Sequence, residues 1–357
     1  MMVLLCTLLL IGMYLIYDEK KYYKYGIVIS LFLIFFLFAF RNNVGIDDYN
    51  YKLYFDLISA GDDKQFFNIS GVEYSYYIIC KVLSFLRLNY KSVFFFYSSI
   101  GFIFIWKTLK KFSLNKEQYL TFFLSFLAFS LIPFITVMRQ FTATAIGIYA
   151  ICDKRINIKN MVLIIIATLF HNSAIIFLPI MLISKIKFIN KKVFYILIPL
   201  IAIFLNSTGI FYSLVKVLLK DTSYYRYILE MNETVFGGSG IIVMLMFSVY
   251  LANLLFLEKE LNNENIKLIS FMQMIFFSLY FLCYGMGVIG RLYYYFIFFE
   301  PLSLILICKN IKNKNNNNNN KLSYYLTSSF LVLLISYNIM NDLERFSILN
   351  YSINFWR

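Results

Sequence analysis

The chain has 357 residues, of which 61% are hydrophobic, 20% are aromatic and only 15% are charged, and its mean hydropathy is +0.70. This composition excludes a soluble domain of ordinary amino-acid usage and indicates an integral membrane protein. The net charge of +14 does not indicate nucleic-acid binding, because the lysines lie in short loops beside apolar runs and form no basic domain.

The apolar runs predict an all-α fold, a polytopic transmembrane helix bundle that forms one membrane domain over residues 1–357. Most runs are near the length that crosses a bilayer as a helix, and the alternating strands of a membrane barrel are absent. About twelve spans are expected, at 1–16, 26–40, 92–106, 119–137, 140–151, 160–170, 172–184, 193–209, 240–257, 266–285, 291–308 and 322–340.

Lysine-rich loops set the orientation. Six loops hold 20 of the 33 Lys and Arg residues: 17–25, 107–118, 152–160, 184–193, 258–267 and 309–321. The positive-inside rule places these loops in the cytoplasm, and both termini and the long loop 206–238 outside. The Asn-rich part of 309–321 is typical of a linker without core-forming capacity. The five cysteines are scattered and show neither a disulfide framework nor zinc-ligand spacing.

The segment 41–91 needs a separate explanation, because the chain must cross the membrane an odd number of times between the outside loop 41–72 and the inside loop 107–118. We expect 73–90 to be an interfacial or re-entrant helix, because Glu73, Lys81 and Arg87 interrupt its apolar pattern.

The first polar motif follows the second apolar run and reads RNNVGIDDYNY, from Arg41 to Tyr51. An arginine where a span leaves the membrane can pair with phosphate oxygens, and Gly45 allows close approach of the backbone. Asp47 and Asp48 can bind a metal, a sugar hydroxyl or the arginine itself. A snorkelling arginine followed by a polar loop is the competing interpretation.

The second motif, MRQFTATA from Met138, joins two apolar runs at a tight hairpin that faces outside. Its small residues permit close helix packing. Arg139 and Gln140 either bind substrate or form a buried pair that holds the hairpin.

The third motif, FHNSA from Phe170, contains the only histidine, His171, at another outer hairpin. Imidazole takes a proton near neutral pH, so His171 is a candidate general base, although a lone histidine is more often structural.

The fourth motif, GMGVIGRLYYY from Gly285, is a glycine-rich outer turn that enters an aromatic helix. Backbone amides at the glycines and the charge of Arg291 suit an anion, and tyrosines such as Tyr294 offer stacking faces and hydroxyls to a sugar. A tyrosine belt at the membrane boundary is the alternative.

Nucleotide-binding signatures are missing from the sequence, which has no phosphate-binding P-loop and no dinucleotide glycine fingerprint. An energy-coupled pump and a glycosyltransferase that uses nucleotide sugars are therefore disfavoured. Chemistry on the outer face requires a pre-activated donor that the membrane delivers.

Taken in order, R-x-x-V-G-x-D-D-Y-x-Y at 41–51, M-R-Q-x-x-A at 138–143, H-N-S-A at 171–174 and G-R-x-Y-Y-Y at 290–295 resemble the EpsG family. These are Wzy-type polymerases of exopolysaccharide, capsule or O-antigen in bacteria. The resemblance implies a helix bundle related to the membrane glycosyltransferases that use polyprenyl-linked donors. It implies a place in the bacterial cytoplasmic (inner) membrane, with the active site on the extracytoplasmic face.

Such an enzyme would transfer a growing glycan from undecaprenyl diphosphate onto a newly flipped, lipid-linked repeat unit. The expected partners are the undecaprenyl diphosphate-linked oligosaccharide, membrane lipid, and a chain-length regulator and flippase of the same pathway, with no nucleic acid.

We expect no cofactor and no metal, because guanidinium groups can stabilise a diphosphate leaving group without one. Arg139 and Arg291 would hold the diphosphate, and Arg41 would assist or position the acceptor. His171 would take the proton of the attacking hydroxyl, with an aspartate of the first motif as the alternative base, and this direct attack would invert the anomeric centre. The predicted catalytic residues are His171, Asp47 and Asp48, and the predicted substrate-binding residues are Arg41, Gly45, Tyr49, Tyr51, Arg139, Gln140, Arg291 and Tyr294.

Two other functions fit parts of this pattern. A glycan ligase, or another polyprenyl-sugar glycosyltransferase, would use the same chemistry with a different acceptor. A flippase or transporter would also have about twelve helices, but its charges are expected near the middle of the bilayer, on broken helices with internal symmetry.

Overall fold

The computed structural model describes residues 22–41, 47–153, 156–184, 192–222, 225, 246–254, 263–284 and 286–314. Every regular element among these residues is a helix, as the composition predicts. The described residues divide into two compact units, one up to Met181 and one from Leu182 onward. The expectation of one membrane domain stays a prediction.

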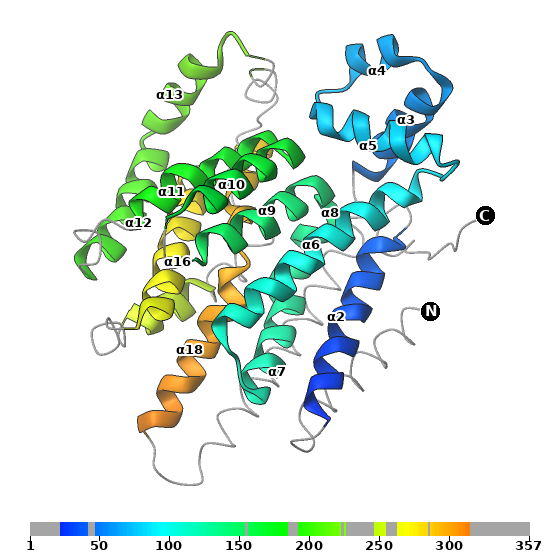
Figure 1. The fold of residues 1–357 in the computed structure, drawn as a ribbon. Coiled ribbons are helices and arrows are strands. Elements are labelled where there is room, and N and C mark those ends of the chain that lie inside the picture. Colours follow the sequence, from blue (N-terminus) through cyan, green and yellow to red (C-terminus); the bar gives the residue numbers. More distant parts are fainter. Residues whose placement is uncertain are drawn as a thin grey trace. The chain divides into compact units, whose positions relative to one another are not determined.

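Four apolar helices build most of the first unit: α2 (Tyr23–Ala39), α6 (Lys91–Phe112), α9 (Met138–Ile151) and α10 (Ile158–Phe170). Helix α6 packs against α2 and α9, and α9 packs against α10 (Figure 1). Gly101 on α6 lies against the ring of Phe141 on α9, and Thr142 Oγ1 donates to the Tyr97 carbonyl at 3.0 Å. Small residues on both helices, Gly101 on α6 and Thr142 on α9, therefore permit close packing of the kind that the second motif predicts.

The apolar run 119–137, predicted as one span, is divided into three helical pieces. These are α7 (Lys116–Ser125), a π-helical turn η1 (Phe126–Ser130) and α8 (Leu131–Thr136). The chain leaves the helical conformation at Val137 before α9 begins. Because the helix stops there, carbonyl groups in the last turn of α8 need partners from outside the helix.

The segment 41–91, expected to be an outer loop followed by an interfacial or re-entrant helix, contains three helices. They are α3 (Asp47–Ala60), α4 (Asp63–Ile69) and α5 (Tyr74–Phe85), and they pack around buried Tyr51, Phe55 and Tyr76. On its other side α5 exposes Ile78, Val82 and Phe85, a pattern typical of a helix that lies against lipid. The position of this segment at the membrane surface stays a prediction.

Membrane-spanning capacity is confirmed for fewer helices than the twelve expected. Among the described residues, α6 and α16 (Glu264–Leu282) are long and apolar enough to cross a bilayer. A third span results if α12 (Lys192–Ser207) and α13 (Ile210–Leu219) are counted together, although they are bent by 75°. The predicted spans 1–16 and 322–340 lie outside the described residues.

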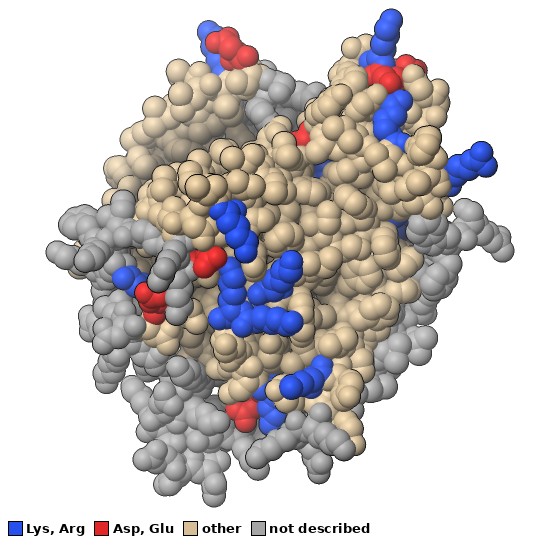
Figure 2. Space-filling view, viewed as in Figure 1, with Lys and Arg blue, Asp and Glu red and all other residues tan. Residues whose placement is uncertain are grey.

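The surface agrees with a membrane protein. Helix α10 exposes Ile158, Val162, Ile165 and Leu169 along one side. The face drawn in Figure 2 shows large areas without charged side chains. Exposed apolar side chains in such numbers are expected where lipid, not water, is the solvent.

The second unit contains α12, α13, a helical stretch at 246–254, α16, α17 (Gly287–Gly290), a 3₁₀ turn η4 (Arg291–Tyr295) and α18 (Phe299–Lys314). A buried chain of polar groups joins three of these helices. Asn253 Nδ2 donates to Gln273 Oε1 at 3.2 Å, and Gln273 Nε2 donates to Glu300 Oε2 at 3.2 Å.

Helices occupy parts of two segments predicted as an outer loop and a linker. Helix α13 lies within the predicted outer loop 206–238, and α18 continues to Lys314 in the predicted cytoplasmic linker 309–321. Residues 315–321 lie outside the described part of the chain.

Candidate functional site

His171 lies where α10 ends. The side chain of Asn157 caps the start of this helix by accepting from the backbone N–H of Asn160 at 2.8 Å. The helix stops at His171 because this residue adopts extended backbone, with φ −158° and ψ 117°. A 3₁₀ turn η2 (Asn172–Ile176) and α11 (Phe177–Ile183) follow. The imidazole remains 28% exposed.

Arg139 is the second residue of α9, directly after the break at Val137. Its guanidinium extends to the α3–α5 segment, where Nε donates to the Tyr51 hydroxyl at 3.3 Å. The guanidinium carbon lies 5.7 Å from the centre of the Tyr51 ring. Burial raises the pKa of Tyr51, so its hydroxyl is neutral and can accept this hydrogen bond. The Arg139 side chain is 16% exposed.

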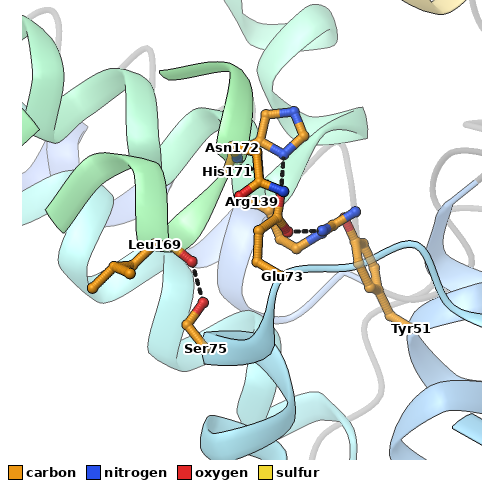
Figure 3. Close-up of polar contacts among 7 residues, drawn as sticks. All are labelled: Tyr51, Glu73, Ser75, Arg139, Leu169, His171 and Asn172. Atoms are coloured by element: carbon orange, nitrogen blue, oxygen red, sulfur yellow. Dashed lines mark hydrogen bonds and ion pairs between the residues drawn. The ribbon is translucent and has the colours of Figure 1, made fainter. Parts of the chain in front are cut away.

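Glu73 connects these two residues. It precedes the first turn of α5, and its carboxylate is only 6% exposed. One oxygen, Oε2, forms an ion pair with Arg139 Nη1. The other, Oε1, lies 2.8 Å from His171 Nδ1 and accepts from the backbone N–H of Asn172 at 3.0 Å (Figure 3).

A hydrogen bond from a side chain to the backbone joins α5 to the end of α10. The Ser75 hydroxyl, two residues after Glu73, donates to the Leu169 carbonyl, two residues before His171 (Figure 3). The carboxylate and the imidazole are therefore attached to two helix ends that are themselves connected.

The charge state of Glu73 determines the tautomer of the histidine. Burial alone would raise the pKa of Glu73, but the hydrogen bond from His171, the charge of Arg139 and the N–H of Asn172 together lower it to about 2. An ionised carboxylate can only accept hydrogen bonds, so Nδ1 of His171 must carry a proton. In the neutral ring the basic lone pair is then on Nε2.

This cluster can support two chemical tasks. A partly exposed guanidinium can bind an oxyanion, and a partly exposed imidazole with its lone pair on Nε2 can accept a proton. Among the described residues, no group of three or more His, Cys, Asp or Glu side chains is placed to hold a metal ion.

Three of the predicted site residues, Tyr51, Arg139 and His171, come together here. Gln140 follows Arg139 on α9 and is buried. Gly45 lies outside the described residues. Asp47 is the half-buried first residue of α3, and Tyr49 points outward from the same helix, 73% exposed.

Arg41 and Asp48 form a different, enclosed pair. Arg41 Nη2 lies 2.9 Å from Asp48 Oδ1, and the two side chains are 0% and 3% exposed. Nη1 of Arg41 donates to the carbonyl of Ile135 in the last turn of α8, and the guanidinium lies 4.5 Å from the centre of the Phe94 ring. This environment suits a structural ion pair, and a substrate or base role for either residue stays a prediction.

Arg291 and Tyr294 belong to the second unit, where both lie half-buried in η4. Their contribution to a shared diphosphate site stays a prediction from the sequence.

Glu73 belongs to the candidate site but lies in none of the four sequence motifs. The sequence presents it only as a charge that interrupts an apolar stretch. One signal was available, because Glu73 is the only acidic residue between Asp63 and Glu117, in a chain of net charge +14. A single carboxylate beside an apolar helix needs a partner, and the partner here is a pair of groups from two other helices.

Comparison with known proteins agrees with the family resemblance of the sequence. The model of the EpsG family matches residues 24–353, which is nearly the whole chain. No curated protein and no solved structure matches the sequence. The extent of the family match, which includes Glu73, Arg139, His171 and Arg291, shows that the chain belongs to the EpsG family.

Proposed function

We propose that the protein is a Wzy-like polysaccharide polymerase that elongates a lipid-linked glycan at the outer face of the bacterial cytoplasmic membrane. Membership of the EpsG family supports a polymerase of this kind. The assignment of residues rests on one observation. The buried carboxylate of Glu73 contacts both Arg139 and His171, and these two side chains are still partly exposed.

In the proposed reaction Arg139 binds the diphosphate that links the growing glycan to its polyprenyl carrier. A hydroxyl of the incoming lipid-linked repeat unit attacks the anomeric carbon of the donor and gives its proton to Nε2 of His171. The bond between that carbon and the phosphate oxygen breaks, and the carrier diphosphate leaves with the electron pair. The guanidinium stabilises this developing negative charge.

The donor, acceptor and accessory proteins belong to the same proposal. The donor is a glycan on undecaprenyl diphosphate, the acceptor is one lipid-linked repeat unit, and a flippase supplies that unit from the cytoplasmic side. A chain-length regulator of the pathway is a further expected partner, and no cofactor enters the reaction.

The test is the glycan profile of a deletion strain complemented with single variants. Arg139→Ala and His171→Ala should leave single lipid-linked repeats in place of long polymer, while the variant proteins stay in the membrane. The matched control is Arg87→Asn, because Arg87 is an exposed arginine with φ 58°, a backbone conformation that asparagine tolerates. Long polymer from both site variants would reject the assignment, and unattached polymer in the deletion strain would indicate a ligase.

A further inference from the structure

We infer that Glu73 is a positioning residue that sets the tautomer of His171 and holds Arg139 beside it. This inference rests on the proposed function, since it names the residue that prepares the proposed base and the proposed diphosphate ligand.

The contacts of the Glu73 carboxylate allow it only one arrangement. Its two oxygens face two different helices, with Arg139 of α9 on one side and the end of α10 on the other. Two hydrogen-bond donors, the Nδ1 of His171 and the backbone N–H of Asn172, converge on the same oxygen. Rotation of the carboxylate would break the ion pair and both of these contacts, so the side chain is fixed in place.

The consequence for His171 is chemical. A carboxylate hydrogen-bonded to Nδ1 directs the basic lone pair to Nε2 and stabilises the positive charge that the ring acquires when it accepts a proton. Without it, the neutral ring could carry its proton on either nitrogen.

The consequence for Arg139 is positional. Arg139 uses Nη1 for Glu73 and Nε for Tyr51, so contacts at two different nitrogens set the plane of the guanidinium. A guanidinium has five N–H donors, so these two contacts leave further donors for a phosphate group.

The experiment compares purified wild-type protein with Glu73→Gln and Glu73→Asp in nanodiscs. The substrate is the lipid-linked repeat unit extracted from cells that lack the gene. For Glu73→Gln we expect kcat to fall by about 100-fold or more. The KM should not rise, because Arg139 keeps its charge for the diphosphate. Glu73→Asp should recover part of the lost kcat.

A pH–rate profile distinguishes positioning from a purely structural role. In the described part of the chain, the charged and titratable groups that interact with Glu73 are His171, Arg139 and Tyr97. Arginine stays charged and tyrosine stays neutral from about pH 5 to 8, so neither of these groups contributes a change in this window. Glu73→Gln removes the negative charge beside His171 and so disfavours the protonated form of its ring. The acidic limb of the pH–rate profile should therefore move to lower pH in this variant.

The control is Asp63→Asn in the same segment, which removes an acid that pairs with Lys81 at 2.9 Å on a more exposed surface. Its kcat and pH profile should match those of the wild type. An unchanged kcat or an unshifted acidic limb in a folded Glu73→Gln protein would overturn the inference. Full activity of Arg139→Ala and His171→Ala would instead reject the proposed function.

A second, independent observation concerns α13 in the second unit. We infer that this helix lies along the membrane surface with its apolar side in the lipid. Helix α13 is bent by 75° from α12, and Gly209 forms the corner with φ +68°. Ten residues of helix are about 15 Å long. At this angle α13 advances only about 4 Å along the direction of α12, so it adds little to the length of that span.

The side chains of α13 fit an interfacial position. None of its residues is buried, and the exposed apolar residues recur at helical spacing on one side: Ile210, Leu214, Val217 and Leu218. Lys216 and Lys220 lie on the other side. An apolar stripe beside lysines is complementary to the acyl boundary and to the phosphates of lipid headgroups.

Spin labels at two positions test this orientation. Leu218 and Lys216 lie on opposite sides of α13, and each would be replaced by cysteine (Leu218→Cys, Lys216→Cys) in a cysteine-free protein in liposomes. We expect the label at 218 to be relaxed more strongly by oxygen, which concentrates in lipid, and the label at 216 more strongly by a water-soluble nickel chelate. Two labels in water would indicate an arm outside the membrane, two labels in lipid would indicate a broken span, and either result would reject the interfacial helix.

Discussion

Among the described residues of the first unit, an arginine pairs with a buried acid at two places, and the surroundings of the two pairs separate their roles. Arg41 and Asp48 are closed off from solvent and form an ion pair with each other. Glu73 and Arg139 are joined to a histidine that keeps 28% of its side-chain surface exposed. A functional group must reach its substrate, so exposure decides which pair suits chemistry and which suits packing.

The enclosed pair should matter for stability. Asp48→Ala leaves the Arg41 charge buried without its partner, which we expect to cost about 3–5 kcal/mol. Asp56→Ala, at an exposed position of the same helix, should cost little. Unfolding of the purified proteins in detergent measures both values. Equal losses from the two variants would contradict a structural role for the Arg41–Asp48 pair.

Glu73 should make stability depend on pH in the acid range. Its pKa is lowered from 4.5 to about 2 in the folded protein. The ionised Glu73 carboxylate therefore stabilises the folded protein fully above about pH 4.5, and this stabilisation is lost as pH falls toward 2. A shift of this size corresponds to about 3 kcal/mol. The difference in unfolding free energy between the wild type and Glu73→Gln should shrink over this window, whereas a constant difference would show that the carboxylate is not stabilised in the fold.

At the scale of elements, α9 is the helix that brings the site together. It packs against α6 on one side and α10 on another, and it presents Arg139 at its start. Small residues at the contacts allow α9 to pack closely against its neighbours. Gly147 lies directly against the ring of Phe177, the first residue of α11.

A larger residue at this contact should separate the helices. A Cβ at position 147 would overlap the buried ring of Phe177, so Gly147→Val should destabilise the protein by about 1–3 kcal/mol. It should also lower activity, because η2 and His171 precede Phe177 directly. The matched control is Gly71→Val, where nothing lies within 4 Å of an added Cβ. The same melting temperature for both variants would show that the α9–α11 contact is not close.

At the scale of the whole molecule, the orientation in the membrane decides whether the site meets a flipped substrate. Helix α10 has thirteen residues and is therefore about 20 Å long. His171 follows one end of it, and Ile156 lies shortly before the other. The lysine-rich loops predict that the end near His171 faces outside.

Cysteine labelling of intact cells checks this orientation. In a cysteine-free background, a cysteine at Lys64, which is exposed on α4 in the same segment as Glu73, should react with an impermeant maleimide. A cysteine at Ile156, which is 41% exposed, should react only after the membrane is opened. The reverse pattern would place the cluster in the cytoplasm and would contradict a polymerase that uses flipped repeat units.

The sequence by itself determined the helical membrane class, the order of the motifs and the family. Hydropathy and motif order are local properties, and they can be read without knowledge of which helices touch. The close packing of the helix after Arg139 also follows from local composition, because small side chains allow approach by any neighbour.

Only the tertiary structure decided which charged groups are partners. Glu73 is 66 residues from Arg139 and 98 residues from His171 along the chain, so no spacing in the sequence indicates their contact. Arg41 resembled Arg139 in the sequence, since both follow an apolar run, yet it is enclosed against the end of α8. The difference depends on where α8 stops and how α3 and α5 pack, because a buried charge is stabilised by the groups that the fold brings to it.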